Sequence, residues 1–246
     1  MTQRFHSARI LLISLFLGML VTGIVGPILA RAQSSDTPYV LVITVDGIIN
    51  SVKGRFIFRA LEQAQYEGST ALIIQLDTPG GLLGPTREIV GLLLESPLPV
   101  SVFVYPKGAR AGSAGTFIAA AANFAVMSPG SNIGAAAPIS STGEDIGDTL
   151  ASKVENDAAA LIRSIAQVRG RDQDKLEQTV RTAAAYSAEE AKAGNVVDFI
   201  ADDLNDLLTQ IDGRVAATSR GPVVLETYGL DVRCLLYTSP SPRDRG

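Results

Sequence analysis

Ser113 is the residue whose type and setting best suit chemistry. It lies in the stretch YPKGARAGSAGTFIAAAA, residues 105–122, between an apolar run typical of a strand and an Ala-rich run typical of a helix. A serine at such a junction exposes its hydroxyl at the carboxyl edge of a sheet, and the free N–H groups of the new helix point at whatever the serine attacks. For this stretch alone, a serine that merely caps the helix is the alternative.

The neighbours of Ser113 are small, since Gly112, Ala114 and Gly115 surround it and let a substrate backbone come close. A second turn, residues 79–82 (PGGL), follows another apolar run. Two glycines in this position let the backbone turn its N–H groups outward, which is the geometry that an oxyanion hole requires. Taken alone, a double glycine after a strand is more often an ordinary turn.

Two residue types are missing from the central part of the chain. The only histidine is His6 and the only cysteine is Cys234, both near the ends. A Ser-His-Asp triad, a thiol nucleophile, a disulfide and a zinc site built from His or Cys are therefore excluded for the folded body. If Ser113 is a nucleophile, its base must be a lysine or a carboxylate.

A lysine base must be neutral near pH 7, which requires burial in apolar surroundings. Five lysines are candidates: Lys53, Lys107, Lys153, Lys175 and Lys192. Lys153 is the best placed, because it lies between apolar neighbours near the start of an expected helix, whose positive end disfavours a further positive charge. A solvated helix lysine is the alternative, and Lys107 is the next candidate.

The charge balance argues against nucleic-acid binding. Residues 33–233 carry 16 Lys and Arg against 24 Asp and Glu, a net charge of −8, and no basic run. Nucleic-acid partners are disfavoured by such a surface.

The first 32 residues have the pattern of a targeting segment. Arg4 and Arg9 precede an apolar stretch over 10–30, and Ala30-Arg31-Ala32 matches a cleavage site. A signal peptide cut after Ala32 is the preferred interpretation, and an uncleaved membrane anchor is the alternative. Both interpretations place the body outside the cytoplasm, with residues 33–38 as a linker.

The body alternates apolar strands and helices. Strands are expected at 39–45, 70–76, 100–105 and 124–127, and helices at 51–67, 85–94 and directly after Ser113. This order predicts an α/β fold with a mostly parallel sheet and right-handed crossovers. Sites in such sheets form beyond the carboxyl ends of the strands, where residues 46–47, 77–82 and 107–113 all fall.

The second half is less regular. Residues 128–147, rich in Gly, Ser and Pro, predict a flexible flap. Helices are expected at 149–168, 172–184 and 202–211, with a short helix capped by Ser187 and a strand at 196–200. We expect residues 213–233 to begin a further, truncated region, in which residues 222–233 (PVVLETYGLDVR) form a strand pair or the start of another domain. Residues 234–246 lack any periodicity and are interpreted as a non-native tail.

The combination of LDTPGGLL (76–83), the stretch around Ser113, NIGA (132–135) and Lys153 resembles the NfeD family of membrane-bound serine proteases. These belong to the ClpP/crotonase superfamily, with repeated ββα and βα units and flanking helices, and are related to signal peptide peptidase A. The resemblance covers residues 38–212, so that 39–212 is the expected protease domain. Family members continue into transmembrane helices and a small β-barrel domain.

The resemblance implies roles for particular residues. Ser113 would be the nucleophile, Lys153 its base, and the N–H groups of Gly81 and Ala114 the oxyanion hole. We expect Gly80, Leu82 and Gly112 to contact the substrate. The implied substrate is the hydrophobic segment of a stomatin-like membrane protein. Self-association as a dimer or larger assembly is expected, without a metal or a cofactor.

The preferred hypothesis is thus an exported serine endopeptidase with a Ser-Lys dyad, membrane-associated on the periplasmic or extracellular face. Two alternatives remain open at this point. A crotonase-like acyl-CoA enzyme would use the same pair of backbone donors, but needs acid–base carboxylates and a basic CoA-binding surface. A non-catalytic scaffold for stomatin-like proteins would have no need of Ser113 and Lys153.

Overall fold

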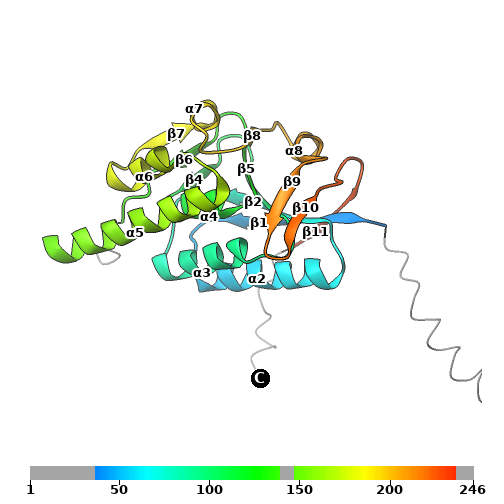
Figure 1. Cartoon of the computed structure of the whole chain (residues 1–246), viewed down its shortest axis with the longest axis horizontal. Coiled ribbons are helices and arrows are strands. Elements are labelled where there is room, and N and C mark those ends of the chain that lie inside the picture. Colours follow the sequence, from blue (N-terminus) through cyan, green and yellow to red (C-terminus); the bar gives the residue numbers. More distant parts are fainter. Residues whose placement is uncertain (1–36, 139–146, 237–246) are drawn as a thin grey trace, which may run out of the picture. The chain divides into compact units, whose positions relative to one another are not determined.

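A computed structural model of the chain describes residues 37–138 and 147–236 (Figure 1). Its centre is a six-stranded sheet in the order β11-β1-β2-β3-β5-β8, in which all neighbouring strands are parallel. The strands of this sheet are β1 (Tyr39–Asp46), β2 (Ala71–Asp77), β3 (Val100–Val104), β5 (Phe124–Met127), β8 (Phe199–Ile200) and β11 (Asp231–Leu235). The predicted α/β class with a mostly parallel sheet is confirmed.

Both faces of this sheet are covered. The helices are α2 (Ser51–Tyr66), α3 (Leu83–Leu94), α4 (Ala114–Ala121), α5 (Asp148–Arg169), α6 (Gln173–Arg181), α7 (Ala188–Ala193) and α8 (Leu204–Ile211). Along β1, Leu41 and Ile43 join the core under α2–α5, whereas Val40 and Val42 join the core under α8. Because successive side chains point to opposite faces, a strand buried on both sides reads as an unbroken apolar run.

Three segments differ from the expected elements. The helix expected at 172–184 ends at Arg181, because Ala183 has a left-handed φ of 52° and residues 185–187 form β7 (Ala185–Ser187) instead. The strand expected at 196–200 is shorter, because only residues 199–200 form a strand, β8. Within the flap expected at 128–147, residues 132–134 form β6 (Asn132–Gly134), whereas residues 139–146 lie outside the described part of the chain.

A second, small sheet was not predicted. It joins β4 (Arg110–Gly112), which directly precedes Ser113, to β6 and β7 in the order β4-β6-β7. The buried Thr116 hydroxyl lies 2.9 Å from the Ala111 carbonyl and accepts the Gly134 N–H at 3.1 Å, which ties α4 to this sheet. Segments distant in sequence are thereby held around the start of α4.

The C-terminal part packs onto the same domain. The hairpin β9 (Val215–Thr218) and β10 (Gly221–Val224) leads to β11, whose residues 231–235 pair with residues 39–43 of β1. The division of this part into a further region and a non-native tail, with its boundary at Arg233, stays a prediction. The expected signal segment lies outside the described residues, and within 37–138 and 147–236 no helix is both long and apolar enough to cross a membrane.

Helix α4 is anchored at its C-terminal end by two arginines from the end of α5. Arg169 Nε donates to the carbonyl of Ala121 at 2.8 Å, and Arg171 donates to those of Ala120 and Ala122 at 3.1 Å each. Arg171 also pairs with Asp198 at 2.7 Å, and its side chain is 1% exposed. The guanidinium groups satisfy carbonyls that a helix end leaves free and complement its negative end.

The turns at the carboxyl edge of the sheet are joined by backbone hydrogen bonds. Ile49 N–H donates to the Gly80 carbonyl at 2.9 Å, and Leu82 N–H donates to the Ile49 carbonyl at 2.9 Å. Next to them, Thr78 N–H donates to the Arg110 carbonyl at 2.7 Å, and Gly112 N–H to the Thr78 carbonyl at 3.0 Å. The segments after β1, β2 and β3 therefore form one continuous backbone network.

Loss of the arginine anchor should destabilise the domain. Arg171→Ala leaves Asp198 and two carbonyls without their buried partner, and we expect it to lower the free energy of unfolding by about 3 kcal/mol in urea titrations. Arg220→Ala, at an exposed position, should change it by less than about 0.5 kcal/mol. Equal effects of the two substitutions would show that the buried contacts contribute nothing specific.

Gly81 tolerates no side chain, because a Cβ built there lies 2.1 Å from the Ile49 carbonyl oxygen. We expect Gly81→Ala to lower the unfolding free energy by about 2–3 kcal/mol in thermal or urea unfolding, through displacement of the turn. Gly84→Ala is the matched control, since nothing lies within 4 Å of its Cβ position in α3. That substitution should stabilise the protein by about 0.5–1 kcal/mol. A neutral Gly81→Ala would contradict the packing argument.

Candidate functional site

Ser113 occupies a turn of unusual conformation between β4 and α4. Its φ is 47° and its ψ is −109°, a combination that non-glycine residues rarely adopt. Its N–H donates to the Gly134 carbonyl at 2.9 Å, whereas its hydroxyl makes no capping hydrogen bond to α4 and has no partner within the described residues. Ser113 therefore precedes the helix without capping it, and its half-buried hydroxyl is free to react.

The two glycine turns lie in direct contact. A Cβ on Gly80, whose φ is 131°, would come within 2.8 Å of Ser113 Cβ. A Cβ on Gly112 would come within 3.0 Å of the Pro79 carbonyl oxygen. Glycine at these two positions is what lets the chain segments approach so closely. The expected meeting of the two turns at one sheet edge is confirmed.

Two backbone donors remain unused beside Ser113. Neither the Gly81 N–H nor the Ala114 N–H has an acceptor within the part of the chain that the structure describes. Gly81 is exposed, whereas Ala114 is the first residue of α4 and is only 4% exposed. Both residues line the same cavity as Ser113. The pair is thus available to bind an oxygen atom of a ligand.

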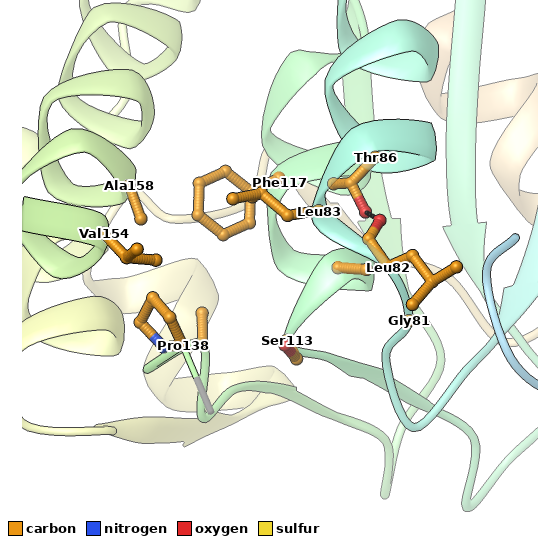
Figure 2. Close-up of a pocket in the computed structure, with 11 residues that line it drawn as sticks. Gly81, Leu82, Leu83, Thr86, Ser113, Phe117, Pro138, Val154 and Ala158 are labelled. Atoms are coloured by element: carbon orange, nitrogen blue, oxygen red, sulfur yellow. Dashed lines mark hydrogen bonds between the residues drawn. The ribbon is translucent and has the colours of Figure 1, made fainter. Parts of the chain in front are cut away.

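That cavity, of about 220 Å³, opens between α3, α4 and α5 (Figure 2). Figure 2 shows Val154 and Ala158 of α5 on one side, Leu82, Leu83 and Thr86 on the other, and Phe117 between them. The remaining residues that line it are Gly81, Ser113, Ala114, Ala136 and Pro138. The Thr86 hydroxyl is used internally, because it donates to the Leu82 carbonyl at 2.8 Å. Among the residues that the structure describes, no charged side chain lines this cavity, so this part of it suits an apolar group.

Lys153 lies directly before Val154 in α5, but its side chain does not line the cavity. It is exposed to solvent, and no hydrogen bond or ion pair joins it to Ser113 or to another described residue. The apolar burial expected for a neutral lysine is not seen here. Helix α5 itself is tied to α3 by the ion pair between Arg87 and Asp157.

The other four lysines each have a partner. Lys53 pairs with Asp46 at 3.0 Å, which holds the pKa of that carboxyl below its ordinary value. Lys107 pairs with Asp202 at 3.0 Å, although Asp202 is distant from it in the sequence. Lys175 and Lys192 lie over aromatic rings, those of Tyr186 and Phe199. Lys153 is therefore the uncommitted lysine of the described residues, on the helix that lines the cavity.

A second cavity, of about 400 Å³, lies on another side of Ser113. It is lined by Ile48, Pro79, Gly80, Gly81, Ser113, Ala135 and Ala137. It shares Gly81 and Ser113 with the first cavity. Of the residues expected to contact substrate, Leu82 lines the first cavity and Gly80 the second, whereas Gly112 lines neither and packs against Pro79. Within the described residues, no cluster of three or more His, Cys, Asp or Glu could hold a metal ion.

Several cavity residues were missed from the sequence. Phe117 follows Ser113 by one helical turn, a spacing that puts both on one side of α4 and could have revealed it. Val154 and Ala158 belong to the apolar stripe of α5, whose pattern does not distinguish a cavity wall from a packed core. Ile48 gave no signal, because a single apolar residue in a turn is common.

Comparisons with known proteins agree with this geometry. Residues 39–218 match the family model of the NfeD1b N-terminal domain. The chain is 34% identical over 211 residues to the membrane-bound protease PH1510 of Pyrococcus horikoshii, covering 84% of this chain and 47% of that protein. The chain thus spans about half the length of this curated relative.

Solved structures of 1510-N, described as a membrane-bound stomatin-specific protease, are also similar. A serine-to-alanine mutant has a TM-score of 0.77 at 33% identity, over 82% of this chain and 99% of that chain. A lysine-to-alanine mutant in complex with a substrate peptide has a TM-score of 0.76 at 33% identity, over 85% and 96%. ClpP1 from Listeria monocytogenes shares the fold, with a TM-score of 0.55 at 18% identity over 68% of this chain and 94% of that chain. The chain therefore belongs to the NfeD family, through an N-terminal domain of the NfeD1b type with a ClpP-like fold.

Proposed function

We propose that this domain is a serine endopeptidase with Ser113 as nucleophile and Lys153 as base. The observation that carries the proposal is the free Ser113 hydroxyl in a left-handed turn, beside two backbone N–H groups that have no internal acceptor. A nucleophile next to preorganised donors is the arrangement that acyl transfer requires. The named proteases among the relatives support the same reaction class.

The reaction would run in two stages. Neutral Lys153 takes the proton of Ser113 Oγ, and the oxygen attacks the peptide carbonyl carbon. The N–H groups of Gly81 and Ala114 bind the resulting oxyanion, each contributing about 3–4 kcal/mol to its stabilisation. The peptide C–N bond then breaks, the lysine returns its proton to the leaving amine, and a water molecule hydrolyses the acyl-serine.

The assignment of Lys153 rests on its position and on elimination. It directly precedes Val154, a residue of the cavity wall, and the other four lysines already have partners. In 1510-N the mutated lysine follows the mutated serine by about forty residues, as Lys153 follows Ser113 here. Catalytic hydrogen bonds are often long without substrate and tighten in the complex. Because an amine is neutral near pH 7 only when it is removed from solvent, the proposal requires that bound substrate cover Lys153.

The substrate would be an apolar segment of a membrane protein of the stomatin type. The uncharged cavity beside Ser113 provides the site for apolar side chains, and the stomatin specificity stated for 1510-N supports this class of partner. The targeting pattern of residues 1–32 supports a location on the periplasmic or extracellular face of the membrane. We further propose that the domain self-associates and does not bind nucleic acid.

Removal of either member of the dyad should abolish cleavage. We expect Ser113→Ala and Lys153→Ala each to lower kcat/KM for an apolar peptide by at least about 10³-fold, because neither the attacking alkoxide nor its proton acceptor would form. Mass spectrometry of the cleaved peptide measures the rate. Lys192→Ala, which changes an amine that lies over Phe199, should retain activity.

A serine-reactive phosphonate provides an independent check, since it should label Ser113 in the native domain and leave Ser113→Ala unlabelled. Full activity of Lys153→Ala would transfer the base to another group, with Lys107 as the first candidate. Full activity of Ser113→Ala would overturn the proposed function altogether.

A further inference from the structure

Ile48 has a large apolar side chain that is exposed to solvent, and it lines a cavity together with Ser113. It is 63% exposed, although the next residue, Ile49, is fully buried. Single exposed apolar residues are ordinary on protein surfaces. Ile48, however, lines the cavity of about 400 Å³ that Ser113 and Gly81 also line, here called the Ile48 cavity.

The backbone around Ile48 is fixed on both sides. Gly47 N–H donates to the Asp77 carbonyl at 2.9 Å, and Ile49 N–H donates to the Gly80 carbonyl at 2.9 Å. The Ile49 carbonyl also accepts the Leu82 N–H at 2.9 Å. Because the residues on both sides of Ile48 are hydrogen-bonded to residues 77 and 80, the backbone of Ile48 has a defined position relative to the glycine turn.

The rest of the Ile48 cavity is also apolar. Its other apolar side chains come from Pro79, Ala135 and Ala137, and no charged residue lines it within the described ranges 37–138 and 147–236. The position of Ala135 is fixed by its N–H, which donates to the Ala184 carbonyl at 2.8 Å. The cavity is therefore a formed surface that excludes charge and offers room for a side chain.

The two cavities meet at the reacting atoms, since both contain Ser113 and Gly81. A carbonyl carbon attacked by Ser113, with its oxygen at the Gly81 N–H, must lie where they meet. The peptide chain then leaves this point in two directions. One direction leads to the cavity of about 220 Å³ that Phe117 lines, here called the Phe117 cavity, and the other leads to the Ile48 cavity.

We propose that Ile48 is a specificity-determining residue that contacts an apolar substrate side chain on the side of the scissile bond opposite the Phe117 cavity. This inference rests on the proposed peptidase function. It implies that substrates are apolar on both sides of the cleaved bond. Cleavage then occurs inside a hydrophobic segment and not at its border with a polar one.

A charge substitution at Ile48 tests the proposal. Wild-type domain, Ile48→Glu and Ile48→Lys are each incubated with a peptide library randomised on both sides of a cleavable bond, and the products are sequenced by mass spectrometry. Ile48→Glu should lower kcat/KM for apolar residues on one side by about tenfold or more and favour Lys or Arg there, with Ile48→Lys favouring Asp or Glu. The preference on the other side should not change.

Val168→Glu is the matched control, because Val168 is also 63% exposed but lies at the C-terminal end of α5. Its profile should equal that of the wild type, and circular dichroism should show all variants folded. Wild-type cleavage with unchanged profiles in both Ile48 variants would overturn this inference alone, as would equal loss of preference on both sides. Absence of any cleavage by the wild type would overturn the proposed function and this inference with it.

Discussion

The site depends on the backbone hydrogen bonds that join the turns at the carboxyl edge of the sheet. Thr78 exchanges bonds with the β4 segment on one side, and Gly80 accepts the Ile49 N–H on the other. These bonds hold three separate segments as one surface, and glycines at positions 80, 81 and 112 remove the side chains that would force them apart. The unused N–H groups of Gly81 and Ala114 follow from this arrangement, because the network binds the groups around them and leaves these two unpaired.

The position of Ser113 is held by contacts at both ends of α4. At the N-terminal end, Ser113 N–H is bound by the Gly134 carbonyl, and Thr116 links the first turn to β6. At the C-terminal end, Arg169 and Arg171 bind the last carbonyls, and burial together with the charge of Arg171 lowers the pKa of the Arg169 guanidinium. A helix of eight residues is too short to be stable alone, so these contacts determine where it begins. The unusual conformation of Ser113 is maintained by this surrounding structure.

Much of the fold could be predicted, because the runs at 39–45, 70–76, 100–105 and 124–127 are long, apolar and buried on both faces. The small sheet could not be predicted, because strands of three residues carry no periodicity. The place of β11 in the large sheet could not be predicted either, because its pairing with β1 joins distant parts of the chain. Glycine spacing and the helix start singled out Ser113 as the candidate nucleophile, whereas the resemblance to the family named Gly81 and Ala114 as the candidate donors. The exposure of Lys153 could not be predicted, because its apolar sequence neighbours lie on other faces of α5 and do not determine what covers its own face.

Helix α5 contains both a wall of the Phe117 cavity and the uncommitted amine, in consecutive residues. Within a regular helix, neighbours are only 1.5 Å apart along the axis and turn together, so Val154 cannot shift while Lys153 stays in place. The backbone of this cavity wall and the backbone of Lys153 therefore move together, although the Lys153 side chain can still rotate about its own bonds. If Lys153 is the base proposed above, a small molecule that fills the Phe117 cavity and displaces α5 would act on proton transfer as well as on occupancy.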